Sequence, residues 1–458
     1  MHFREFLKRP WWRRVWTVQE VALAAHMNWA SSAPVLVYCG KDEIPFECVL
    51  GGLLEIFAYH SMAFEKYVLN DVIWACGLMA HSIPRSAFAQ SPHNLSIGSL
   101  MRKIRGCSSR DPKDRIYGLY GIFERAGVDV PQPSYLKSTE DIYWESTLAL
   151  YRYTKSASLM TLVSGLSINP STPSWVPNYA EVPRVSDQIH PPKATKTLNS
   201  RIDFSKDNRK LFIYGTIVDI IQKSSGHTVW LPSTADSIIE DGPFVNLEEG
   251  YAESIRAFRD WYRVLQTNDS LAIYGDYDSK ILAFSQSLTH GMTWLSNLRL
   301  GTERENNVAV GFWLCLLFGV GEQSYRMSAL EEAIKQAGIE QYFYSSPERR
   351  YLTEDEDWQT LCMLKHHPGT AHIHHLIWMM MRDKTFFVTR DGYMGTAYKS
   401  IRDNDVIALV EGVDQPMILR PNGESPEEWQ VICPAYIEGM MQGELWTEGL
   451  ELQEFTLV

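Results

Sequence analysis

The sequence predicts an α+β protein with a mainly helical middle region and a small C-terminal β-barrel. Three observations lead to this fold class. A strand-like run stands between two helical runs near the N-terminus, and helical spacing dominates the middle of the 458-residue chain. The end of the chain consists of short β-rich runs separated by turns, a pattern typical of a small barrel or sandwich.

The first element is expected to be a helix that begins at Pro10, because the missing N–H of proline would be unpaired in the first turn anyway. The helical pattern continues through Leu23. Val35–Cys39 is a short β-rich run, and helical spacing returns over Pro45–Tyr59. One strand between two helices indicates the edge of an α/β layer, which we expect over residues 1–60.

Residues 61–175 are expected to be mainly helical. Asp111 is a capping candidate for one helix, with Pro112 in its first position, and Ser138 can cap another that runs to Tyr153.

Residues 176–383 are expected to form a mixed α/β region that contains one strong strand, Leu211–Ile221. The barrel and tail are expected over residues 384–458. The β-rich runs there are Phe386–Thr389, Thr396–Tyr398, Val406–Val410, Met417–Leu419 and Trp429–Ile432.

Composition narrows the classes of function. The formal net charge of −12 repels phosphate backbones, so we expect no nucleic-acid partner. Seven scattered cysteines without a C-x-x-C argue against a disulfide framework or structural zinc, and favour a reducing compartment. The longest apolar run, Val308–Val320, is too short to span a bilayer. We therefore expect a cytoplasmic protein without a membrane span.

The N-terminal helix carries the one candidate catalytic carboxylate. On a continuous helix, Arg13, Thr17 and Glu20 share one side, and Glu20 lies one turn after Trp16. A carboxylate beside indole rings, with its charge offset by Arg13, could stabilise a developing cation or carry a proton. The alternative is an ion pair that anchors the helix, and the spacing alone favours that alternative.

The segment His366–His375 is the dense group of potential metal ligands in the chain. Pairs such as His372 and His375 can share a helix face, but the segment holds no Asp, Glu or Cys, and a Pro-Gly turn divides it. We expect a polar loop and helix start, with a pH-sensitive patch as an alternative, and no metal site. The sequence also lacks the hydrolase, P-loop, zinc-protease and dinucleotide-binding motifs, so no cofactor is expected.

Several stretches resemble fungal HET (heterokaryon incompatibility) domain proteins, in the order of the family and over nearly the whole chain. Arg9–Ala24 is similar to the motif near the end of the HET domain, and Val35–Gly40 to the strand and glycine that follow it. The other similar stretches are Asp111–Leu119, Pro173–Tyr179, Phe387–Gly395 and Ala435–Glu444.

The resemblance implies a role in nonself recognition and programmed cell death, through assembly or regulation with protein partners, self-association included. It also implies that residues 1–60 are the C-terminal part of a TIR-like HET layer. Some TIR-type proteins cleave the nicotinamide–ribose bond of NAD with a glutamate, and Glu20, supported by Arg13 and Trp16, is the residue we nominate. NAD would then be a substrate and not a cofactor.

The family's opening strand and the helix after it have no counterpart before Pro10. We therefore expect a chain that is truncated relative to the family, or a mis-assigned gene start or degenerate paralogue, and that is catalytically incomplete. The alternatives are an NAD-cleaving hydrolase that uses Glu20 and a structural remnant without activity.

Overall fold

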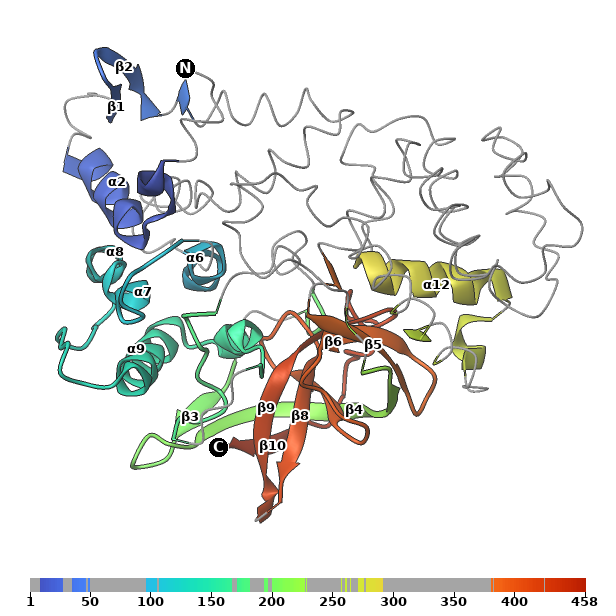
Figure 1. Cartoon of the computed structure of the whole chain (residues 1–458). Helices are drawn as coiled ribbons and strands as arrows, with labels where there is room; N and C mark the ends of the chain where they lie inside the picture. Colours follow the sequence, from blue (N-terminus) through green and yellow to red (C-terminus); the bar gives the residue numbers. More distant parts are fainter. Residues whose placement is uncertain are drawn as a thin grey trace, which may run out of the picture.

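A computed structural model of the chain combines helices with one large, mainly antiparallel sheet, which confirms the α+β class (Figure 1). The residues that the structure describes are 9–27, 35–46, 48–49, 96–104, 107–166, 171–181, 193–196, 200–226, 228, 257, 260–261, 264, 271–275, 277–290, 380–381, 383–423 and 425–458.

The N-terminal helix is broken, which corrects the expectation of one continuous helix. A 3₁₀ turn, η1 (Pro10–Arg13), is followed by α2 (Val15–Met27), and Arg14 between them is extended, with φ −75° and ψ 130°. Arg14 forms an isolated parallel bridge with Ser108, whose carbonyl accepts the N–H of Val15 at 3.1 Å. This tertiary pairing replaces the helical hydrogen bonds at the junction.

The expected strand near residue 36 is present and pairs locally. β1 (Leu36–Cys39) and β2 (Asp42–Pro45) form a two-stranded antiparallel hairpin in which Leu36 lies opposite Pro45. Most of the helical run expected over Pro45–Tyr59 lies outside the described residues.

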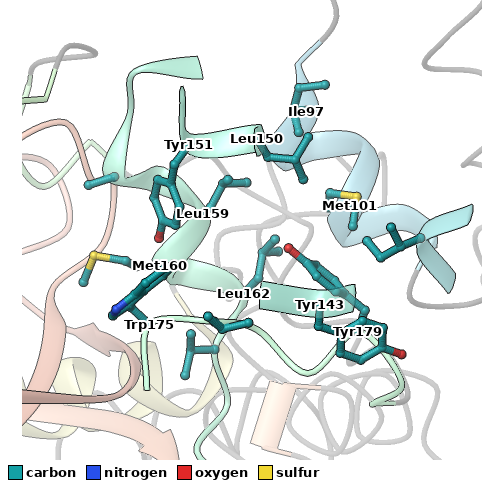
Figure 2. Close-up of a cluster of buried hydrophobic side chains, with 14 of the residues drawn as sticks. Ile97, Met101, Tyr143, Leu150, Tyr151, Leu159, Met160, Leu162, Trp175 and Tyr179 are labelled. Carbon is teal, nitrogen blue, oxygen red and sulfur yellow. The ribbon is translucent and has the colours of Figure 1, made fainter. Parts of the chain in front are cut away.

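The helical part that follows holds a continuous apolar core. Its elements are α6 (Ile97–Ile104), α7 (Asp114–Tyr117), α8 (Tyr120–Ala126), α9 (Thr139–Thr154) and the 3₁₀ segment η3 (Ala157–Leu162). Figure 2 shows side chains of α6, α9 and η3 meeting Trp175 and Tyr179 in this core.

The helix caps agree in part with the sequence. Ser138 caps α9 as predicted, because its hydroxyl accepts the backbone N–H of Asp141 at 3.0 Å. Asp111 instead accepts the N–H of Lys113 at 2.9 Å, and α7 begins later than predicted, at Asp114.

The C-terminal sheet closes on itself. The strands β4–β5–β6–β9–β8–β7 pair in that order, and β7 pairs again with β4, which completes a ring of strands. The strands are β3 (Ile202–Phe204), β4 (Leu211–Ser224), β5 (Lys384–Thr389), β6 (Met394–Tyr398), β7 (Val406–Val410), β8 (Met417–Asn422), β9 (Ser425–Ile437) and β10 (Gln453–Leu457).

The sheet extends beyond the predicted 384–458 segment, because β3 and β4 belong to it. β4 has 14 residues and irregular registers, and this length lets it pair with β10 at its start, with β7 through its middle and with β5 at its end. In Figure 1, β4 (green) crosses among the strands of the chain's end (orange and red). The remaining described elements, η5 (Leu271–Tyr274) and α12 (Tyr277–Thr289), contact each other, and α12 packs on β6.

Across the described part of the chain, every helix is too short or too polar to cross a lipid bilayer.

Candidate functional site

The nominated carboxylate lies on the surface of α2. The side chain of Glu20 is exposed, and Trp16, one turn earlier, is half-buried against the helical core. Arg13 belongs to η1 and not to α2, because of the break at Arg14. The structure therefore keeps Trp16 and Glu20 on one helix and places Arg13 on a different element, so the predicted helical spacing from Arg13 to Glu20 is wrong.

α2 instead packs against the family-like stretch Asp111–Leu119 and the start of α8. A Cβ atom on Gly118 would lie 2.9 Å from Cγ1 of Val15 and 2.9 Å from the carbonyl oxygen of Asp114. Gly121 donates its backbone N–H to Oε1 of Gln19 at 3.1 Å. Close approach of backbone to a neighbouring helix needs glycine. The first two family-like stretches are therefore one packing unit.

The third family-like stretch, Pro173–Tyr179, is a strap that lies between α9 and the barrel. Its Trp175 is fully buried and stands edge-to-face on Tyr151 of α9, with ring centroids 5.8 Å apart. The hydroxyl of Tyr179 lies 2.8 Å from Oγ1 of Thr147, also on α9. The strap is thus held to α9 at two side chains.

Ser174 holds the strap to the barrel. Its backbone N–H donates to the backbone oxygen of Val458 at 2.9 Å, and its hydroxyl donates to the same oxygen. The same hydroxyl accepts the N–H of Val431, on β9, at 2.8 Å.

These contacts fall where β9 changes partners. β9 pairs with β10 at Glu428–Trp429 and with β6 at Ala435–Ile437. Between these two ladders, Ser174 binds Val431, and a Cβ atom on Gly165 would lie 2.5 Å from the carbonyl oxygen of Ile432. The strap and Gly165 therefore cover this interval of the barrel wall.

A cleft of about 570 Å³ lies beside the strap. It is bounded by the strap, the first turn of α9, the turn between β3 and β4, and residues 430–432 of β9. Its charged lining residues are Glu140, Glu181, Arg209 and Lys210.

The two cations of the cleft have protein partners. The guanidinium of Arg209 lies 4.1 Å from the ring centroid of Trp144, and Nζ of Lys210 lies 2.5 Å from Oε1 of Glu428. Both cations are therefore engaged by side chains of the protein.

The barrel also has a counterpart among known families. Residues 323–458 match the model of the Het-6 beta-barrel domain. The C-terminal part of the chain is thus similar to a Het-6 barrel. Along its full length it is also 22% identical to heterokaryon incompatibility protein 6, OR allele, of Neurospora crassa, and the alignment covers 67% of that protein. The resemblance to heterokaryon incompatibility proteins is thereby confirmed. No solved structure is significantly similar to the chain.

The two tail stretches that resemble the family pair with each other inside the Het-6 barrel. Gly395 of β6 lies opposite Ile437 of β9. A Cβ atom on Gly395 would lie 2.6 Å from the ring of Phe387 and 2.8 Å from the carbonyl oxygen of Tyr436. Only glycine leaves the space that these strands occupy.

A polar cluster that the sequence did not reveal lies where α12 meets the Het-6 barrel. His290 stacks on Tyr436, with ring centroids 4.8 Å apart and 9° between the planes, and its Nε2 lies 3.0 Å from Oγ1 of Thr396. Burial, together with the positive charge of Lys384, lowers the pKa of His290 well below its usual value.

The cluster continues to Glu438. Tyr436 donates its hydroxyl to Oε2 of Glu438 at 2.8 Å, and Tyr274 donates to the backbone carbonyl of Glu438 at 2.9 Å. Burial raises the pKa of the Glu438 carboxyl. No local sequence signal distinguishes His290 from the other histidines, because its partners come from distant strands.

The prediction that His366–His375 holds no metal site concerns residues that lie outside those described by the structure. Within the described part of the chain, no three His, Cys, Asp or Glu residues are arranged to hold a metal ion.

Proposed function

We propose that the chain acts in fungal heterokaryon incompatibility, as a nonself-recognition protein that works through assembly or regulation. The observation that carries this proposal is the similarity of the whole chain to heterokaryon incompatibility protein 6, OR allele, of Neurospora crassa. Its partners would be proteins, including further copies of the chain. It would act in the cytoplasm, and its activity would lead to programmed cell death.

The packing of the family-like stretches supports the proposal. Arg9–Ala24 contacts the Gly118–Gly121 turn, and Phe387–Gly395 pairs with Ala435–Glu444. Pro173–Tyr179 connects the helical core to the barrel. The family-like stretches thus contact one another or join parts of the fold. This is expected for a protein that acts through its folded surface.

We further propose that residues 1–60 are the end of a TIR-like layer and that this chain does not cleave NAD on its own. The support is the surroundings of Glu20, whose side chain is exposed on α2 while Arg13 lies in another element. An exposed carboxylate stays hydrated, whereas a catalytic carboxylate is usually desolvated and held by neighbours.

Genetics in the source fungus tests the role in incompatibility. The gene is deleted, and the deletion strain is forced into heterokaryons with a panel of incompatible strains. We expect growth to be restored with at least one strain, and the incompatibility to return when the wild-type gene is reintroduced. A gene with the Gly118→Leu substitution serves as the matched control, because α2 cannot pack against residue 118 in its product. This gene should not restore the incompatibility. Unchanged incompatibility with every strain would contradict the proposal.

A further inference from the structure

We propose that the strap, Pro173–Tyr179, is a latch that keeps the wall of the barrel closed and couples it to helix α9. This inference is independent of the proposed function, because it concerns how two parts of the fold are joined. It gives a role to the third family-like stretch.

The barrel side of the latch is a set of hydrogen bonds centred on one residue. Ser174 donates two hydrogen bonds to the backbone oxygen of Val458 and accepts one from the N–H of Val431. Val458 in turn donates its N–H to the carbonyl oxygen of Trp429 on β9, at 3.0 Å. Ser174 therefore hydrogen-bonds to β9 as a neighbouring strand would, at a position where neither β10 nor β6 pairs with β9.

The helix side of the latch begins at the next residue. Trp175 is fully buried against Tyr151, and its Nε1 donates to the carbonyl oxygen of Arg209 at 3.3 Å. Tyr179 bonds to Thr147 and stands edge-to-face on Tyr143, with centroids 5.1 Å apart. Because Ser174 and Trp175 are adjacent, a shift of α9 is transmitted directly to the bonds on β9.

One side of the strap faces a cleft. The 570 Å³ cleft runs along one side of it, from Pro173 to Asn178. Just before the strap, the buried Oγ1 of Thr172 has no hydrogen-bond partner.

Amide hydrogen exchange on the full chain tests the latch. Ser174→Ala removes both side-chain bonds, and we expect the amides of Val431 and Val458 to exchange about tenfold faster. The amide of Ile407, on β7 and two strands away from β9 in the ring, is the internal reference and should change little. No acceleration at Val431, or an equal acceleration at Ile407, would overturn the proposal.

A second variant tests the coupling without touching the barrel. Tyr179→Phe removes the bond to Thr147 and changes no residue of the barrel, yet the latch predicts about threefold faster exchange at Val431. Tyr151→Phe is the matched control, because the Tyr151 hydroxyl is buried without a hydrogen-bond partner. If Tyr179→Phe leaves the exchange of Val431 unchanged, the strap only covers β9 locally, and the coupling between α9 and β9 is refuted.

Discussion

Gly121 donates its backbone N–H to the side-chain oxygen of Gln19 at 3.1 Å, and this bond ties α8 to α2. The two residues belong to separate segments of the sequence, and the contact is possible because neither Gly118 nor Gly121 has a side chain. The helical core is thus organised around a glycine face that receives α2.

Gly118→Ala should destabilise the protein. The new Cβ atom would meet the backbone oxygen of Asp114 and Cγ1 of Val15 at 2.9 Å, so α2 must shift, at a cost of about 1–3 kcal/mol. Gly98→Ala on α6 is the control, because its nearest neighbour is 3.8 Å away and alanine favours a helix by about 0.5–1 kcal/mol. Chemical denaturation measures both. A Gly118→Ala protein as stable as Gly98→Ala would contradict the docking of α2.

Two buried tyrosines of the same core should respond differently to loss of the hydroxyl. The Tyr179 hydroxyl bonds to Thr147, and its removal in Tyr179→Phe should lower the free energy of unfolding by about 1 kcal/mol. The Tyr151 hydroxyl has no partner, so Tyr151→Phe should be neutral or stabilising. Thermal unfolding of the two variants distinguishes them, and equal losses of stability would refute the hydrogen-bond assignment.

The barrel holds a buried ion pair whose loss should be costly. Nε and Nη2 of Arg420 bind the two carboxylate oxygens of Asp405 at 2.7 and 2.8 Å, and the Asp405 side chain is only 3% exposed. Arg420→Met leaves that carboxylate without its cation and should cost about 3 kcal/mol. Lys223→Met removes the cation from the exposed pair with Asp403 and should cost less than about 1 kcal/mol. Urea denaturation compares them, and similar midpoints for the two variants would be the contrary result.

His290 should make stability depend on pH below neutrality. Because burial lowers the pKa of His290 in the folded state, the unfolded chain binds the proton more readily, below about pH 6.5. The contribution of a neutral His290 is therefore complete above about pH 6.5 and is lost as the pH falls, by at most about 1.4 kcal/mol per pH unit.

His290→Asn is the variant for this test, since His290 has φ +51° and asparagine tolerates that left-handed conformation. The difference in unfolding free energy between the two proteins is measured from pH 5.5 to 7.5. It should grow with pH in favour of the wild type. A constant difference would show that His290 does not titrate between the folded and unfolded states.

Sequence patterns predicted the elements that depend on neighbours in the chain. The strands β5 to β9 were predicted from short β-rich runs and turns, and the Ser138 cap from the residue that precedes α9. The break at Arg14 could not be predicted, because it depends on pairing with Ser108. The entry of β4 into the barrel depends in the same way on pairing with distant strands.

In the candidate site, too, the sequence pointed to local stretches but not to their tertiary contacts. The Pro173–Tyr179 stretch was noticed as a resemblance, but its role between α9 and β9 follows only from the tertiary contacts of Ser174 and Tyr179. Glu20 was nominated from a helical spacing that the extended Arg14 interrupts.

The most direct test of the proposal that this chain does not cleave NAD on its own is NAD consumption by the purified full chain at high protein concentration. Cleavage needs a positioned carboxylate, and loss of positioning by several kcal/mol lowers a rate about tenfold for each 1.4 kcal/mol. We expect the wild type and Glu20→Ala to consume NAD at the same rate as buffer. Turnover by the wild type that disappears in Glu20→Ala would contradict the account and establish Glu20 as a catalytic residue.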